Sequence, residues 1–442
     1  MAIADETAGW GIEPVPDRLR RLGLVDTALL WGNLGVSLLV IVAGALLVPA
    51  LSLRDALVAC LVGALLGNAM LAVAGMIGAD ARVPSMVVLR APLGQRGSWA
   101  PTALNVLQCL GWSVFELIVI ATAAAALSDS LLGFEARWLW TLVFGALAIS
   151  LGLLGPVGVV RRVLRKYAVW IVLASLAYLS WWALDGVDLG AAWDAPGEGG
   201  LSTWQGIDLV VGITVSWIPL AADYTRFSTG RRAGLLGTGV GYFVSSAWML
   251  VLGVLLLLGR DITDAASLPA AVAAAGVASA LALLAVTVDE TDEAFANVYS
   301  TAVSLQNLLP AAPQRLLVAG AGVVATIGAL LLEISDYEPF LYLLGSFFVP
   351  LFAVLVADWL LAGMRYRRSH VFESPPVRGG LLLAWLAGFV VYQWLHPSGP
   401  DWWLDAVARL DPPSWTIGAT LPSFALSFAL AAAAAALGGR RF

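Results

Sequence analysis

Residues 283–305 read LLAVTVDETDEAFANVYSTAVSL, an apolar stretch interrupted by Asp289, Glu290, Asp292 and Glu293. A helix in a lipid bilayer tolerates few charges, because each one costs about 2.5–3.5 kcal/mol near the bilayer centre. The stretch is therefore either a loop between membrane spans or a span that binds something positively charged. The rest of the sequence decides between these two interpretations.

The composition is that of a membrane protein. Hydrophobic residues make up 60% of the 442, charged residues only 12%, and the mean hydropathy is +0.87. Ordinary soluble domains are about one quarter charged. Twelve apolar runs each approach the roughly 20 residues that a membrane-crossing helix needs, which predicts one all-α polytopic unit. The runs are 28–49, 56–77, 103–127, 138–154, 169–184, 207–222, 241–258, 278–305, 316–332, 341–361, 381–395 and 417–437.

The basic residues predict the orientation. With twelve spans, 20 of the 24 lysines and arginines lie on one side of the membrane and four lie on the other. The positive-inside rule then places both termini of this cell-membrane protein in the cytoplasm. Residues 1–24 lack the apolar core of a signal peptide, so they are predicted to form a cytoplasmic N-terminal segment.

Two of the predicted spans are interrupted. Residues 29–40 read LLWGNLGVSLLV, with Gly32 and Gly35 on either side of an asparagine, and residues 212–227 read GITVSWIPLAADYTRF, with Pro219 in the middle. Irregular backbone is tolerated at membrane depth only where it lines a protein cavity. Interrupted spans at matching positions of two halves indicate a transporter site between inverted repeats. The alternative is that these glycines only permit close helix packing.

Four stretches resemble the nucleobase–cation symporter-1 family. They are ARVPSMVVLRAPLGQRGSWAPTALNVLQCLGW (81–112), PLAADYTRF (219–227), ANVYSTAVSLQN (296–307) and GSFFVPLFAVLVADWLL (345–361). The second and third are most similar to the hydroxymethylpyrimidine transporter, or CytX-type, branch. The resemblance implies the LeuT-type fold of two inverted five-helix repeats, and uptake coupled to sodium or protons.

The domain boundaries follow from this fold. Residues 25–362 are expected to form the transporter core, with repeats at about 25–185 and 204–362. A cytoplasmic loop is expected at 363–378. Two additional membrane helices and a short cytoplasmic tail are expected at 379–442.

A candidate substrate site begins on the third span. Gln108, Trp112 and Glu116 recur every four residues and therefore share one helix face. The resemblance implies that this face lines the pocket and that its tryptophan stacks on the substrate ring. A carboxylate can accept hydrogen bonds from an amino group, as it does when proteins read cytosine. The same site is expected to include Asn33, Thr214, Ser216 and Trp217. The alternative is that the two tryptophans only pack or face lipid.

The carboxylates of residues 283–305 form the candidate coupling site. No basic residue lies in the core of a span, so a bound cation or proton is expected to offset their charge. The resemblance implies that this span faces the interrupted first span at a sodium site. Carboxylates stand here where that family has hydroxyls, which leaves sodium and proton both open. The predicted coupling residues are Asp289, Asp292, Glu293, Gly32, Gly35 and Ser37, and Glu290 is left without a role. Asp223 and Arg226 are interpreted as a structural pair or a gate.

The leading functional hypothesis is a symporter for a small pyrimidine, with hydroxymethylpyrimidine or cytosine favoured. A purine or hydantoin-like permease is the alternative within the class. A channel would favour symmetric pore-lining rings, and a membrane enzyme would need a catalytic motif that the sequence lacks. We expect a monomer without cofactor or nucleic-acid partner, whose ligands are the substrate, the coupling cation and the lipid bilayer.

Overall fold

The computed structural model describes residues 10–159, 169–260, 262, 265, 267–332, 337–413 and 417–437. Within these residues the regular secondary structure is helical, apart from one isolated bridge between Leu22 and Ser228. The helices of the first half are α2 (Leu24–Asn33), α3 (Leu38–Ala45), α4 (Leu53–Ala81), α5 (Ser85–Val88), α6 (Arg90–Leu93), α7 (Trp99–Leu132), α8 (Arg137–Val159), α9 (Val169–Gly186) and α10 (Leu189–Asp194). Those of the second half are α11 (Thr203–Val215), η3 (Ile218–Leu220), α12 (Ala221–Thr225), η4 (Ala233–Gly237), α13 (Thr238–Gly259), α14 (Leu268–Ala274), α15 (Val277–Asp289), α16 (Thr291–Leu308), α17 (Gln314–Leu331), α18 (Tyr337–Leu361), α19 (Arg368–Phe372), α20 (Gly379–Leu395), α21 (Asp401–Ala408) and α22 (Thr420–Leu437).

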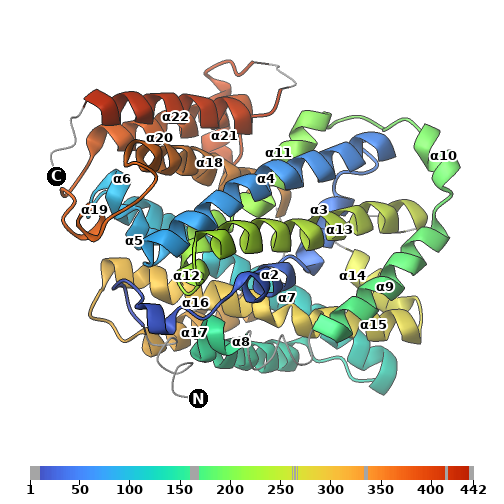
Figure 1. The fold of residues 1–442 in the computed structure, drawn as a ribbon. Coiled ribbons are helices and arrows are strands. Elements are labelled where there is room, and N and C mark those ends of the chain that lie inside the picture. Colours follow the sequence, from blue (N-terminus) through green and yellow to red (C-terminus); the bar gives the residue numbers. More distant parts are fainter. Residues whose placement is uncertain are drawn as a thin grey trace.

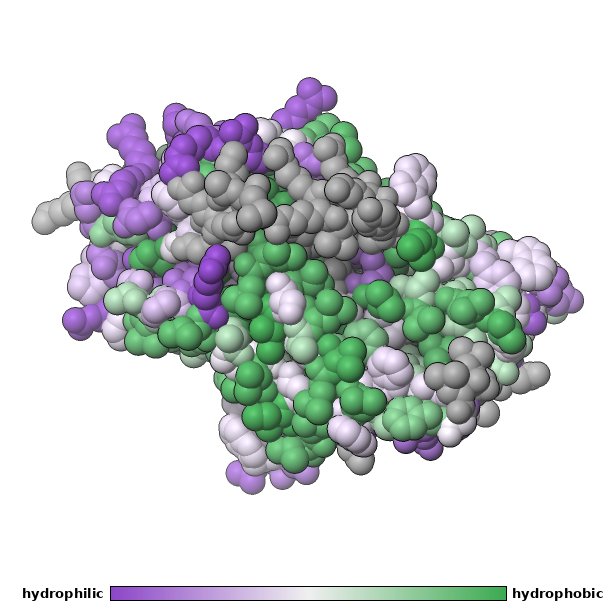
Figure 2. All heavy atoms as spheres, turned by 90° about the horizontal axis from the view of Figure 1, so that it is seen from below, coloured by the Kyte–Doolittle hydropathy of each residue, from purple (hydrophilic) through white to green (hydrophobic). Residues whose placement is uncertain are grey.

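Every predicted apolar run coincides with one of these helices or with a pair of them, except 207–222, which covers α11, η3 and the start of α12. In the described part of the chain, eight helices are long and apolar enough to cross a membrane. The number of spans rises to nine if the bent pair of α2 and α3 is counted as one span. The count of twelve spans therefore stays a prediction. The long helices run alongside one another (Figure 1). Apolar residues fill the middle of the face in Figure 2, with hydrophilic residues gathered at its ends, as expected for a protein that spans a bilayer.

Both predicted interruptions are present. Helix α2 ends at Asn33 and α3 begins at Leu38, with a bend of 59° between them. In the sixth span, α11 ends at Val215 and the chain passes through the 3-10 turn η3 before α12. Pro219 lies within that turn, where its missing N–H and fixed φ are tolerated.

The carboxylate stretch is helical rather than a loop. Helices α15 and α16 are separated only by Glu290, whose φ of −50° and ψ of −22° are themselves helical. Helix α16 packs with α7, α8 and α17, whereas α13 packs with α2, α3 and α4, and α4 packs with α11 and α12. Two groups of helices therefore meet around the candidate site, and α18, α20 and α22 pack together beside them.

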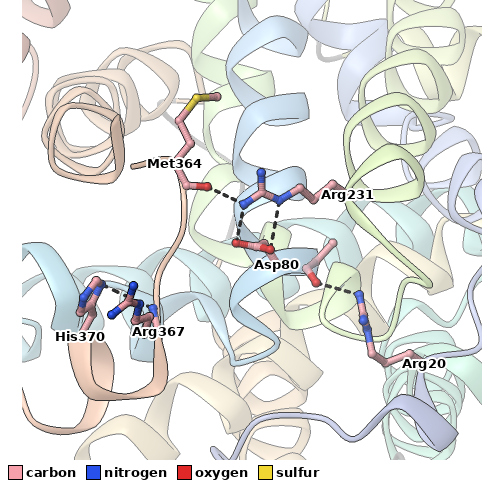
Figure 3. Close-up of polar contacts among 7 residues, drawn as sticks. Arg20, Asp80, Arg231, Met364, Arg367 and His370 are labelled. Carbon is pink, nitrogen blue, oxygen red and sulfur yellow. Dashed lines mark hydrogen bonds and ion pairs between the residues drawn. The ribbon is translucent and has the colours of Figure 1, made fainter. Parts of the chain in front are cut away.

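Polar contacts join several segments at the end predicted to face the cytoplasm (Figure 3). Arg231 donates two hydrogen bonds to Asp80 at the end of α4, from Nε to Oδ1 at 3.0 Å and from Nη2 to Oδ2 at 2.9 Å. It also donates to the Met364 carbonyl, and Arg20 donates to the Ala79 carbonyl at 2.8 Å. The hydrogen bonds that Arg231 donates to Asp80 raise the pKa of Arg231. These contacts tie α4 to the segment before η4 and to the loop after α18.

Candidate functional site

A small cavity lies where the two groups of helices meet. Its walls come from α3, α7, α11, α13, α16 and the two interrupted segments. The lining residues are Ser37, Leu39, Val40, Trp112, Glu116, Ile213, Ser216, Trp217, Tyr242, Glu293 and Asn297.

Helix α7 contributes Trp112 and Glu116, which lie one turn apart and are both buried. The Trp112 ring meets Phe340 of α18 edge-on, with ring centroids 5.2 Å apart. Trp217, beside the break of the sixth span, lies 5.9 Å from the ring of Trp31 and is also edge-on. Such packing restricts the tryptophan rings, so each presents a defined surface to the cavity.

Asn297 was missed by the sequence reasoning and lies at the centre of the polar wall. Its Nδ2 donates to Glu116 Oε1 at 3.0 Å and to the backbone carbonyl of Glu293 at 3.2 Å. The amide thus connects the third and eighth spans. Asn297 lies one helical turn after Glu293, and this spacing on a polar stripe is the signal that could have identified it.

Three predicted substrate residues are not among those that line the cavity. Gln108 donates to Asn105 Oδ1 at 2.7 Å and to the Ser216 carbonyl at 3.0 Å, so it holds the third span against the sixth. Thr214 packs against α4, where a Cβ on Gly67 would come within 2.7 Å of it. Asn33 instead points toward Asp289.

Glu290, left without a role by the sequence reasoning, contacts the break of the first span. Its Oε1 accepts a hydrogen bond from Ser37 Oγ at 2.7 Å, and its Oε2 accepts one from the backbone N–H of Leu38 at 2.7 Å. Leu38 is the first residue of α3, and a helix start offers unpaired N–H groups and a positive dipole end. The carboxylate therefore lies where a helix start favours a negative charge.

Asp289 lies on the other side of the same break. Its Oδ1 accepts from Asn33 Nδ2 at 3.1 Å, while its Oδ2 is buried and has no hydrogen-bond partner among the described residues. The predicted Asp292 falls on a side chain outside the described ones. Among those that are described, no three acidic, histidine or cysteine side chains converge as they would around a metal ion.

The two glycines predicted for the coupling site lie against α13. A Cβ on Gly35 would come within 2.3 Å of Ser245 Oγ, and one on Gly32 would approach the Gly241 carbonyl at 3.4 Å. Gly35 therefore allows the interrupted segment to approach α13 closely. This is the packing role that the sequence analysis left open for these glycines.

Comparisons with known proteins agree with this architecture. The family model described as permease for cytosine/purines, uracil, thiamine, allantoin matches residues 14–375. The cytosine permease of Escherichia coli (strain K12) is 25% identical over 387 residues, which cover 86% of this chain and 88% of that protein. The hydantoin permease of Microbacterium maritypicum is 24% identical over 393 residues, covering 81% and 77%.

The fold is also that of solved transporters. Mhp1, a nucleobase-cation-symport-1 family transporter in a closed conformation with bromovinylhydantoin bound, superposes with a TM-score of 0.78 at 19% identity, covering 97% of this chain and 95% of Mhp1. A Na⁺-coupled sialic acid symporter superposes with a TM-score of 0.55. The chain therefore has the LeuT-type fold and belongs to the family of permeases for cytosine, purines and related compounds. It is a multi-pass nucleobase transporter and not an enzyme.

Proposed function

We propose that this permease imports a small pyrimidine that carries an amino group, with hydroxymethylpyrimidine or cytosine favoured, in symport with sodium or protons. The observation that carries the proposal is the Glu116 carboxylate, held by Asn297 in a cavity that Trp112 and Trp217 also line. A flat ring fits against an indole face, and the carboxylate accepts hydrogen bonds from an exocyclic amine. We place the protein in the cell membrane as a monomer with both termini in the cytoplasm.

The lining of the cavity supports a flat ring with polar groups at its edge, because two tryptophans and the hydrogen-bonded pair of Glu116 and Asn297 all face it. The cytosine permease of E. coli also supports a pyrimidine. The second candidate is a hydantoin-like or purine substrate, which the hydantoin permease relative favours.

Asp289, Glu290 and Glu293 are proposed to couple uptake to the cation, with Asp292 as a further candidate. Glu290 and Asp289 approach the break of the first span, while Glu293 lines the cavity. A cation moving inward across about 100 mV supplies about 2.3 kcal/mol, which corresponds to roughly fifty-fold accumulation. Such coupling is reciprocal, so substrate and cation raise each other's affinity by the same factor.

Ligand-induced stabilisation of the purified protein tests the substrate. Cytosine and 4-amino-5-hydroxymethyl-2-methylpyrimidine should raise its melting temperature, and uracil, which lacks the amine, should not. Glu116→Gln should weaken binding by about 1.5–3 kcal/mol, the range for a hydrogen bond to a charged group. Stabilisation by hydantoins or purines alone would transfer the assignment to the second candidate. Repeating the titration against sodium at fixed pH, and against pH without sodium, identifies the ion.

A further inference from the structure

We propose that Asp223 is a proton-binding site distinct from the carboxylates of the eighth span. Its protonation accompanies closure of the protein at the end predicted to face the cytoplasm. From the sequence, Asp223 could be either part of a structural pair with Arg226 or part of a gate. The contacts of the carboxyl group favour the gate, with the proton rather than Arg226 as the partner of Asp223.

The carboxyl group of Asp223 is only half satisfied. The residue lies in the single turn of α12 and is fully buried. Its Oδ1 accepts a hydrogen bond from the Ser85 backbone N–H at 2.9 Å, whereas its Oδ2 has no hydrogen-bond partner in the described structure. The Ser85 hydroxyl accepts in turn from the Ala222 N–H at 2.8 Å, so helices α5 and α12 are joined at this point.

No positive charge touches this carboxyl group. Arg226, the nearest basic residue in the chain, donates to the Gly11 carbonyl at 2.8 Å and to the Tyr299 hydroxyl at 2.9 Å. No basic side chain within the described ranges forms an ion pair with Asp223. Arg226, which attracts the carboxylate without touching it, and the Ser300 and Ser85 hydroxyls favour the charged form, but complete burial outweighs them. The group therefore neutralises by taking a proton.

The other titratable groups that face Asp223 do not replace this proton. They are Tyr224 on its own helix, Cys109 on α7 and Tyr299 on α16. Tyrosine and cysteine side chains are already mostly neutral at pH 7 in water, and burial favours the neutral form further. Asp223 is therefore the group in this cluster that gains or loses a charge when water reaches it.

The position of Asp223 links its proton to a conformational change. Helix α12 packs on α4, in one group of helices, while the Tyr224 hydroxyl donates to the Ala296 carbonyl of α16, in the other, at 2.8 Å. Separation of the two groups admits water, and the hydrated carboxylic acid releases its proton to it. Closure removes the water, and the carboxylate takes a proton back. The ratio of open to closed forms then rises up to tenfold per pH unit above the midpoint.

Cys109 offers a direct measure of this opening. It is fully buried beside Asp223, and the only other cysteine is Cys60. In full-length protein carrying Cys60→Ala, the rate of Cys109 alkylation by N-ethylmaleimide reports how often the cluster opens. The thiol itself reacts faster as pH rises. To cancel this intrinsic effect, the alkylation rate of the protein with Asp223 is divided at each pH by the alkylation rate of the Asp223→Asn variant.

We expect this ratio to be near one at about pH 5 and to rise up to tenfold per pH unit above the midpoint. An ionised Asp223 would oppose formation of a nearby thiolate, so its direct effect on Cys109 has the opposite sign. Asp208→Asn is the matched control. Asp208 is another buried carboxylate of the sixth span, but it accepts from the N–H groups of Ala419 and Thr420 at the start of α22 instead of joining the cluster around Cys109, so the ratio measured with it should stay flat.

A ratio that stays constant from about pH 5 to about pH 9 in folded protein would overturn the proposal. If Asp223→Asn does not fold, Asp223→Ser replaces it, because a serine hydroxyl can still accept from the Ser85 N–H. The experiment uses no substrate and no sodium. Its outcome is therefore independent of whether the permease carries a pyrimidine.

Discussion

The interrupted first and sixth spans meet the same physical problem with different chemistry. Each frees backbone groups from a helix inside a membrane, where these groups need partners. The first break receives a carboxylate from another span, because Glu290 accepts from the Ser37 hydroxyl and the Leu38 N–H. The sixth break receives no charge: the Trp217 N–H donates to the Thr214 carbonyl at 3.2 Å, and the neutral amide of Gln108 from the third span donates to the Ser216 carbonyl at 3.0 Å. Aromatic rings then cover it, including Trp31 against Trp217.

This difference indicates a division of labour between the two breaks. The first one concentrates polar groups and negative charge, as a cation or a proton requires. The second one presents an aromatic surface, as a flat substrate ring requires. Substitutions at the first break should therefore alter ion dependence, and substitutions around the second should alter ring affinity.

Glu290→Gln should have the largest effect. The amide oxygen of glutamine can accept from only one of the two donors, Ser37 or Leu38, and each buried donor left unpaired costs about 1–3 kcal/mol. The negative charge that would offset a cation is also lost. We expect concentrative uptake of labelled cytosine into proteoliposomes to fall about 100-fold, as a loss of about 2.7 kcal/mol implies.

Ser37→Ala serves as a graded control, because it keeps the carboxylate and removes one hydrogen bond to Glu290, together with the cap that the Ser37 hydroxyl provides for the Leu39 N–H. Uptake should fall less than in Glu290→Gln, while equilibrium binding of substrate without ions should be similar in both. Normal accumulation in Glu290→Gln, under sodium and proton gradients alike, would contradict the role given to the first break.

Trp112→Ala should produce the next largest effect, on affinity rather than on coupling. Stacking of a base on an aromatic side chain is worth about 1–3 kcal/mol by alanine substitution. Substrate affinity should therefore fall about 5- to 150-fold with an unchanged sodium or pH dependence, as measured by isothermal titration. Phe340→Leu is the matched control, since Phe340 meets the edge of Trp112 and does not line the cavity. Equal losses in both variants would indicate packing instead of stacking.

The sequence predicted those features that depend on neighbouring residues in the chain. The twelve apolar runs and the two breaks are visible because glycine, proline and hydropathy act locally. Glu290 was missed because its partners, Ser37 and Leu38, lie about 250 residues away. A helical wheel of one span contains no information about where another span breaks.

Gln108 is the reverse case, because it was predicted to line the cavity and does not. Its spacing puts it on the face of Trp112, but spacing does not reveal how the sixth span crosses that face. The Ser216 carbonyl meets the Gln108 amide there and takes it out of the cavity wall. The sequence therefore predicted which residues share a helix face. Which of those residues line the cavity depended on how distant spans pack against that face.

A third test addresses the contacts that hold the start of α11 in the sixth span. One residue in these contacts, a buried histidine, makes the stability of the fold depend on pH. The Tyr342 hydroxyl donates to the Gln205 carbonyl in the first turn of α11 at 3.2 Å, and its ring stacks on His396 at 3.9 Å. Burial lowers the pKa of His396 to about 4 from its ordinary 6.5. The unfolded chain therefore binds a proton below pH 6.5 that the folded chain does not bind until about pH 4.

Stability contributed by neutral His396 is consequently complete above pH 6.5 and is lost as the pH falls toward 4. At about pH 5 the loss should be about 2 kcal/mol. His396→Phe keeps a stacking ring and removes the titration, so its melting temperature should fall less between about pH 7 and about pH 5. Tryptophan fluorescence of detergent-solubilised protein measures this difference, and an identical fall in both proteins would exclude His396 as the cause.

The smallest effect is expected at the ion pair of Arg231 and Asp80, which lies beside the first span at the end predicted to face the cytoplasm. Arg231 pairs with Asp80 and lies just before η4, which packs on α2 and α4. The arginine side chain is 41% exposed, and exposed ion pairs contribute about 0.2–1 kcal/mol. Arg231→Lys cannot keep the two-pronged contact. It should lower the melting temperature by only about 1–2 °C, and less in high salt, where surface charges are screened.

Arg232→Lys, at an exposed neighbour, provides the control and should change nothing measurable. Because the Arg231 contact lies far from the carboxylates, ion dependence of uptake should stay as in the unaltered protein. A change in ion dependence in Arg231→Lys would mean that the polar break of the first span is adjusted from the end predicted to face the cytoplasm. The division of labour would then belong to whole spans rather than to their breaks.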